Sequence, residues 1–218
     1  SCSSPFWLGR DTGLKSYRLT VFDTLPRTGI PERFASYAEY ERHVQIMMDA
    51  GLIRDATRIW WDVRPSAKFP TLETRVMDVC TRLDDTIALT ALLVCILRML
   101  YRLRLNNQRW RIYTPMLIRE NRWRAMRYSF DEGLIDLAKG RIVPFDELLD
   151  ELLSLVAEDA QALGCEAEVN SLHHILQRGT SAHRQLKKFE LERAGGATEE
   201  EALRCVVDRL IHDTAEGL

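Results

Sequence analysis

Two short stretches between positions 58 and 78 alternate apolar and polar residues with the period of a β-strand. The stretches are residues 58–64 and 71–78, and Pro65 and Pro70 bracket the turn between them. We therefore expect two adjacent antiparallel strands.

Most of the remaining chain carries apolar residues at helical spacing. Ser36 and Glu39 form a capping-box pattern, so a helix is expected from there to Gly51, which ends it. Thr114 and Pro115 mark another start, because proline is tolerated at the first helical position. The other expected helices cover 84–105 with Thr81 as a candidate cap, 145–163, 166–177, 180–193 and 198–214.

These elements predict an α+β fold, with a small antiparallel sheet and a mainly helical C-terminal half. Residues 1–80 form the loop and strand region and residues 81–218 the mainly helical region. The first 35 residues are rich in Gly, Pro and Asp and predict an ordered loop with one short strand at 17–22. A small hairpin is expected at 134–143.

The charge is nearly balanced overall but uneven along the sequence. The 218 residues have a net charge of −2 and are 46% hydrophobic, which is typical of a globular protein. Nine arginines and one acid lie between Arg98 and Arg127, interleaved with Trp110 and Trp123. This stretch offers an alternative function, a nucleic-acid or partner-binding module. The arginines are spread around two predicted helices, however, so we do not expect nucleic acid as the partner.

The cysteines and the longest apolar run indicate where in the cell the protein is located. Five scattered cysteines without a CxxC pair are typical of reduced thiols, so a cytoplasmic protein is expected. The apolar run from Ile87 to Leu97 is shorter than the ~20 residues that span a bilayer, so no membrane is expected. The beginning, Ser1-Cys2-Ser3, favours a fragment or a split chain.

Pairing of the two predicted strands would bring four charged residues onto one face: Asp62, Arg64, Glu73 and Arg75. A carboxylate is a suitable ligand for Mg²⁺, and arginines bind phosphate oxygens in bidentate fashion. The face is therefore a candidate magnesium–nucleotide site. The alternative is a cross-strand ladder of salt bridges on a solvated sheet.

Four blocks of the sequence resemble one known family. Ser4-Pro-Phe-Trp-Leu-Gly-Arg-Asp-Thr-Gly followed by Ser-Tyr-Arg resembles the "SPFW-G-DTG--SYR" block of the type 2 glutamate–cysteine ligases, also called carboxylate–amine ligases. Arg64-Pro-Ser through Arg75 resembles the "RPS--F-T-E-R" block. Glu120-Asn-Arg-Trp-Arg-Ala resembles "EN-WRA", and Arg178-Gly-Thr-Ser-Ala with Arg-Gln resembles "RGTSA-RQ".

The resemblance implies that residues 1–218 are the C-terminal part of a single ligase catalytic domain, with a fold like those of glutamine synthetase and the guanidino kinases. It also implies that ATP phosphorylates a carboxylate, typically that of glutamate, and that an amine, typically that of cysteine, then displaces phosphate. The residues at the matching positions acquire implied roles: Arg75 and Arg64 in catalysis, Arg18 in binding a substrate carboxylate, Arg122 and Arg124 in ATP binding, and Glu73 as a Mg²⁺ ligand.

Two of the family's blocks have no counterpart here, an early strand with clustered glutamates and a His-x-His-x-Gly block. They supply most of the family's metal ligands, so this chain is expected to bring part of a site and to be inactive without the N-terminal part, on the same or a separate chain. A homo-oligomer and an exposed apolar sheet edge near Ser1 are also expected. The second alternative is a non-catalytic assembly subunit, favoured if Glu73 and Arg75 are locked together with no open cleft beside them.

Overall fold

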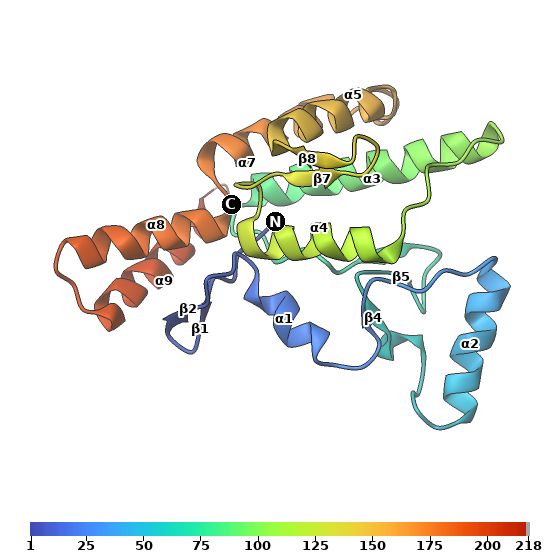
Figure 1. The fold of residues 1–218 in the computed structure, drawn as a ribbon, viewed down its shortest axis with the longest axis horizontal. Helices are drawn as coiled ribbons and strands as arrows, with labels where there is room; N and C mark the ends of the chain where they lie inside the picture. Colours follow the sequence, from blue (N-terminus) through green and yellow to red (C-terminus); the bar gives the residue numbers. More distant parts are fainter. Residues whose placement is uncertain (217–218) are drawn as a thin grey trace. The chain divides into compact units, whose positions relative to one another are not determined.

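The computed structural model describes residues 1–216, in which helices are combined with four two-stranded sheets (Figure 1). This combination of helices and small sheets confirms the predicted α+β class. The chain forms two compact units, residues 18–78 and residues 1–17 with 79–218.

The unit of residues 18–78 contains the predicted strand pair in shorter form. β5 (Val63–Pro65) pairs antiparallel with β6 (Leu72–Thr74), and the register places Arg64 opposite Glu73. β4 (Trp60–Trp61) instead pairs in parallel with β3 (Thr28–Gly29).

The first predicted strand is therefore divided between two sheets. The backbone explains the division, because Asp62 lies between β4 and β5, its N–H donates to Gly29 and its carbonyl accepts from Arg75. The strand predicted at 71–78 covers only Leu72–Thr74, so the prediction was too long by one residue at its start and by four at its end.

A helix replaces the strand that was predicted at residues 17–22. α1 (Tyr17–Asp23) buries Leu19, and the guanidinium of Arg18 lies 4.8 Å from the ring centroid of Phe22, one turn further on. Side chains four residues apart meet on a helix and not on a strand. Local contacts of this kind override the weak strand preference of Thr, Val and Phe.

α2 (Tyr37–Asp49) covers this unit's apolar core. It begins at the predicted cap, because the Ser36 hydroxyl accepts from the Glu39 N–H. The side chain of Glu39 accepts from the N–H of Ala35 rather than that of Ser36. The core residues on and beside α2 are Tyr40, Val44, Ile53 and Ile59, with Phe34 and Trp61 packed against them.

The other unit is mainly helical, as predicted. α3 (Leu83–Leu105) packs on α5 (Phe145–Leu163), and Figure 1 shows them side by side. The shared core consists of Ala88, Cys95, Met99, Leu149, Val156, Ala160, Val169 and Leu172. α8 (Ser181–Ala194) and α9 (Glu199–Ala215) form a second packed pair.

Two of the helices predicted in this unit differ from the observed ones. α3 begins after Arg82 without a side-chain cap, and the hydroxyl of Thr81 accepts a hydrogen bond from Arg184 instead. The helix predicted at 166–177 is divided at Ser171 into α6 (Glu166–Asn170) and α7 (Leu172–Arg178).

Two hairpins complete the helical unit. The predicted hairpin at 134–143 is confirmed as β7 (Leu134–Asp136) and β8 (Arg141–Val143), which follow α4 (Pro115–Tyr128). Near the chain start, β1 (Phe6–Trp7) pairs with β2 (Arg10–Asp11). Trp7 and Leu8 are 47% and 85% exposed, so apolar surface near Ser1 is present as predicted.

The face of α3 that points away from the core carries a row of exposed apolar side chains. They recur at intervals of three, four or seven residues, which places them on one side of the helix. The row consists of Leu83, Ile87, Val94, Leu97, Tyr101 and Leu105, which are 40–65% exposed. We call this row the α3 face.

α3 has 23 residues and is therefore longer than the apolar run from Ile87 to Leu97. By length and composition it could span a bilayer, but the core helices of soluble proteins meet the same criterion.

Candidate active site

Glu73 on β6 is the centre of a charged cluster in the unit of residues 18–78. Its Oε2 accepts hydrogen bonds from Arg64 Nε at 3.0 Å and Nη2 at 2.8 Å, and from Arg75 Nη2 at 3.0 Å. The strand register predicts the first pair, because Arg64 lies directly opposite Glu73. The side chain of Glu73 is about one-third exposed.

Arg64 connects this cluster to the backbone around it. Its side chain is 4% exposed, and Nη1 donates to the carbonyl oxygens of Ala56 at 3.0 Å, Thr57 at 2.8 Å and Ile59 at 2.5 Å. A buried guanidinium needs acceptors for its several donors, and these carbonyls supply them. Arg64 therefore holds the turn before β4 against Glu73.

Arg75 and Arg18 lie next to each other beside the same strand. Arg75 follows β6, its side chain is 37% exposed, and its Nε is a buried donor without a partner. Arg18 on α1 donates from Nη2 to the carbonyl of Arg75 at 2.7 Å and lies 3.5 Å from Asp78. Four of the six candidate residues therefore lie in one cluster, with Arg75 the most exposed of its arginines.

The arginines also determine the charge state of Glu73. The hydrogen bond from Arg64 is the largest cause that lowers the pKa of Glu73, and the bond from Arg75 adds to it. The carboxyl is therefore ionised at neutral pH, which a ligand for a cation requires. Both arginines contact Oε2, and a hydrogen bond from the Ser66 side chain also helps to lower the pKa of the carboxyl.

Arg122 and Arg124 belong to the other unit. Arg124 donates to the backbone oxygens of Gly133 at 3.2 Å and Glu132 at 2.5 Å, and Arg122 lies near the sulfur of Met126. Asn121, from the same block, bonds both the N–H and the carbonyl of Ile135. Much of this block therefore fastens α4 to the β7–β8 hairpin.

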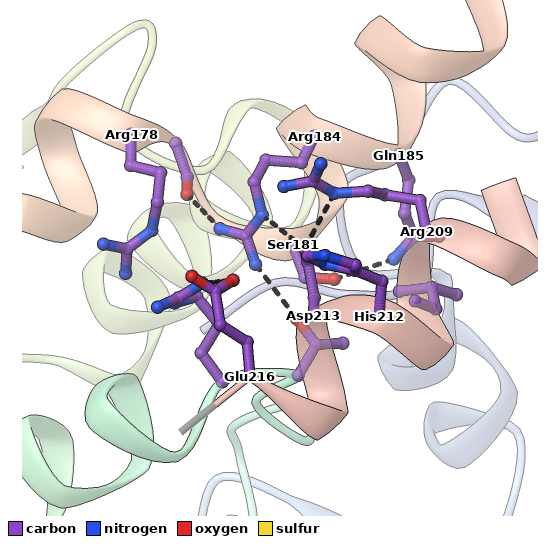
Figure 2. Close-up of polar contacts among 12 residues, drawn as sticks. Arg178, Ser181, Arg184, Gln185, Arg209, His212, Asp213 and Glu216 are labelled. Carbon is purple, nitrogen blue, oxygen red and sulfur yellow. Dashed lines mark hydrogen bonds and ion pairs between the residues drawn. The ribbon is translucent and has the colours of Figure 1, made fainter. Parts of the chain in front are cut away.

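The "RGTSA-RQ" block lies in a polar network between α8 and α9, shown in Figure 2. Arg184 donates to Asp213 at 3.0 Å and to the Gly179 carbonyl at 2.7 Å, and Arg178 pairs with Asp85. The amide of Gln185 donates to the Ser3 carbonyl at 2.9 Å and thereby ties the chain start to α8.

Asp213 was not predicted from the sequence. Its side chain is only 2% exposed, accepts a hydrogen bond from Arg184 and forms an ion pair with Arg209. It forms a group with His212 and Glu216 that has the spacing of a metal site (Figure 2). Asp213 is neutralised by two arginines and Glu216 pairs with Arg82, so a bound cation is electrostatically disfavoured.

His183 at the start of α8 is a second polar feature that the sequence did not indicate. Its Nδ1 accepts from the Thr180 N–H at 3.1 Å and hydroxyl at 2.8 Å, and its Nε2 lies 2.9 Å from Asp131. These partners assign the proton to Nε2. Burial lowers the pKa of His183, against the opposing effect of the Asp131 carboxylate.

We expect His183 to make the folded state less stable in mild acid. Its folded pKa lies below the unfolded value of about 6.5, so its contribution is complete above that pH and is lost as pH falls through the folded pKa. A protonated Nδ1 cannot accept from Thr180, and a lost cap costs about 0.5–2 kcal/mol. Urea unfolding between pH 7 and 5 should show this loss, and a non-titrating His183→Gln variant should reduce it. Equal pH dependence of both proteins would contradict the assignment.

The arginine-rich stretch is partly neutralised within the fold. Arg98 and Arg102 bind Asp159 at 2.5 and 2.8 Å, and the side chain of this aspartate has no exposed surface. Arg102 also pairs with Glu158. Arg127 donates to the Gly13 carbonyl. These contacts count against a continuous basic surface for nucleic acid.

Comparison with known proteins places these residues in one family. The model of glutamate–cysteine ligase family 2 matches residues 1–208. A protein of Rhodospirillum rubrum is 61% identical over 216 residues, which are 99% of this chain and 56% of that protein. Proteins of Jannaschia sp. and Sorangium cellulosum are 55% and 44% identical, each with 56% of its length covered.

All three relatives carry the name "Putative glutamate--cysteine ligase 2". The chain spans about 56% of the length of each. The family model covers nearly the whole chain, including the blocks that contain Arg18, Arg64, Glu73, Arg75, Arg122 and Arg124. The chain therefore belongs to glutamate–cysteine ligase family 2.

Proposed function

We propose that this chain is part of an ATP-dependent carboxylate–amine ligase that joins glutamate to cysteine through an acyl-phosphate. The observation that carries the proposal is the cluster of Arg18, Glu73 and Arg75, a partly exposed carboxylate with guanidiniums beside it. Family membership supports the ligase class, and the cluster lies in two of the blocks that resemble the family.

In the proposed reaction a carboxylate oxygen of the substrate attacks the γ-phosphorus of ATP, and ADP leaves. The amine nitrogen then attacks the acyl carbon, phosphate leaves, and the nitrogen loses a proton to give the amide. Arg75 stabilises charge on the transferring phosphoryl group, and Arg18 binds a substrate carboxylate. Arg64 acts indirectly, because its own donors hold Glu73 and the backbone.

Glu73 fits the role of one Mg²⁺ ligand but does not form a complete site. Mg²⁺ is usually held by one or two carboxylates together with substrate phosphates and water. The ionised Glu73 side chain is about one-third exposed, and its Oε2 is occupied by Arg64 and Arg75. Arg122 and Arg124, on α4, are the proposed ATP contacts of the other unit.

We further propose that the remaining part of the ligase polypeptide completes the site and covers the α3 face. The face is apolar and exposed, and the relatives have 44% of their length outside the matched region. An exposed apolar surface of this length usually marks an interaction site.

We also propose a cytoplasmic location, which fits the five free thiols, and a homo-oligomer.

A charge on the α3 face should prevent this association. We expect Val94→Asp to abolish binding to the remaining part of the Rhodospirillum rubrum relative, because a desolvated carboxylate without a partner is unfavourable. Val94 is 45% exposed, so the chain itself should stay folded. The control is Val207→Asp on α9, where the valine is 54% exposed. Equal binding by both variants, measured by calorimetry, would exclude the α3 face.

Trapping of the acyl-phosphate tests the proposed reaction. A chimera that joins this chain to the remaining part of the Rhodospirillum rubrum relative would be incubated with ATP, Mg²⁺, glutamate and hydroxylamine. Hydroxylamine attacks an activated acyl group, so we expect a glutamyl hydroxamate and an equal amount of phosphate. Phosphate release without hydroxamate would contradict an acyl-phosphate.

The non-catalytic alternative has one observation in its favour. Glu73 is paired with both Arg64 and Arg75, which is the arrangement of a structural salt-bridge cluster. A chimera that folds and binds but never forms hydroxamate would favour a role in assembly.

A further inference from the structure

Two cysteines that are far apart in the sequence meet inside the helical unit. The sulfur of Cys95, in the middle of α3, lies 3.5 Å from the sulfur of Cys165. Cys95 has no exposed surface, whereas Cys165 is half-buried. Seventy residues separate the two thiols along the chain.

The path of the chain between α5 and α6 produces this contact. Gly164 ends α5 in the left-handed conformation with φ of 66°, which glycine adopts readily. The N–H of Cys165 then donates to the Ala160 carbonyl at 3.1 Å, and the residue takes the position before α6. Cys95 belongs to the core cluster of α3, and Cys165 packs against that cluster.

We propose that Cys95 and Cys165 are an oxidation site, at which a peroxide converts the two thiols into a reversible disulfide between α3 and the α5–α6 junction. The sulfur of Cys165 attacks one oxygen of the peroxide, the O–O bond breaks, and a sulfenic acid and water or an alcohol form. The sulfur of Cys95 then attacks the sulfenic sulfur, and the hydroxyl leaves with a proton as water. A small thiol restores the pair by thiol–disulfide exchange.

The surroundings of the two sulfurs give this order of events. Cys165 is the more accessible thiol and therefore meets the peroxide first. Burial raises the pKa of Cys95 to about 11, so Cys95 is protonated at neutral pH and is poorly suited to attack a peroxide. Its contact with Cys165 suits it to the second step.

The movement that the bond requires is small. A disulfide has an S–S distance of about 2.05 Å, so the sulfurs must approach by about 1.5 Å. Cys165 lies outside α5 and α6, and Cys95 can turn about its side-chain bond while the backbone of α3 stays in place. The bond would close a loop of 70 residues, and long closed loops stabilise the folded state the most.

The experiment treats the reduced 218-residue chain with hydrogen peroxide. We expect the five free thiols to fall to three, a Cys95–Cys165 linked peptide on non-reducing mass mapping, and recovery of all five with dithiothreitol. The melting temperature should rise by about 10 °C in the oxidised protein.

Two serine variants complete the test. Cys165→Ser should lose the linked peptide and the rise in melting temperature, whereas Cys205→Ser, a half-buried cysteine on α9, should keep both. In a Cys95→Ala variant the sulfenic acid of Cys165 should persist and react with dimedone. Oxygen addition to Cys165 without a linked peptide in the unmodified chain would overturn the proposal, as would an undiminished loss of two thiols in Cys165→Ser.

Discussion

Replacement of Arg75 by alanine should lower the turnover of the complete ligase about 100-fold or more, by analogy with the removal of one positioned donor. Its guanidinium is the most exposed of the arginines in the Glu73 cluster, and one of its nitrogens has no partner. A lysine should restore only part of the activity, because it cannot bind two oxygens in a fork.

Stability measured on the same Arg75→Ala preparation separates catalysis from structure. The Arg75 side chain of the Arg75–Glu73 pair is more than one-third exposed, and exposed ion pairs contribute about 0–1 kcal/mol to the free energy of unfolding. We therefore expect a nearly unchanged melting temperature in the chimera with the Rhodospirillum rubrum part. Normal turnover with a lowered melting temperature would remove Arg75 from the mechanism.

Replacement of Arg64 by alanine should have the opposite result, a large loss of stability in residues 18–78. The change leaves the carbonyls of Thr57 and Ile59 without donors and Glu73 without its closest partner. A buried carbonyl that loses its donor costs about 1–3 kcal/mol, whereas Glu73 is about one-third exposed and keeps Arg75 as a partner. Hydrogen exchange of peptides from residues 56–75 measures this loss locally.

Arg75→Ala is the matched control for that measurement, since it removes the other arginine from the same carboxylate. Its exchange protection should change little. If Arg64→Ala left the amides of residues 56–75 as protected as in the unmodified chain, Arg64 would not stabilise the backbone around it.

The sequence predicts the helices of this chain better than its strands. α2 has the Ser36 cap and α5 has acids in its first turn and Gly164 at its end, and both helices lie where they were expected. The strand pair was recognised from alternation, but Asp62 divides its first member between two partners. α1 was not predicted, because its Thr, Val and Phe favour strands, whereas the contact between Arg18 and Phe22 one turn apart and the burial of Leu19 stabilise a helix.

The cluster around Glu73 could be predicted because strand pairing converts sequence spacing into proximity. The register that brings Arg64 opposite Glu73 follows from the turn between the two strands. The three carbonyl partners of Arg64 have no signature in the sequence, because any residue type has a carbonyl. The catalytic role of these residues stays a prediction.

The burial of two aspartates, Asp159 and Asp213, could not be predicted from the sequence. Asp159 and Asp213 have the same residue type as exposed neighbours on their helices, and their pairing depends on which helix packs opposite. The contact between Cys95 and Cys165 could not be predicted either, because 70 residues separate the two cysteines and only the packing of the helices brings them together.

Phosphate release is the most direct test of the central claim that this chain supplies one part of a ligase site. With ATP, Mg²⁺, glutamate and cysteine, the 218-residue chain alone should release no phosphate above background, because Glu73 provides one metal ligand at most. The chimera with the remaining part of the Rhodospirillum rubrum relative should release phosphate only when both amino acids are present. Robust release by the chain alone, dependent on both amino acids, would contradict the account.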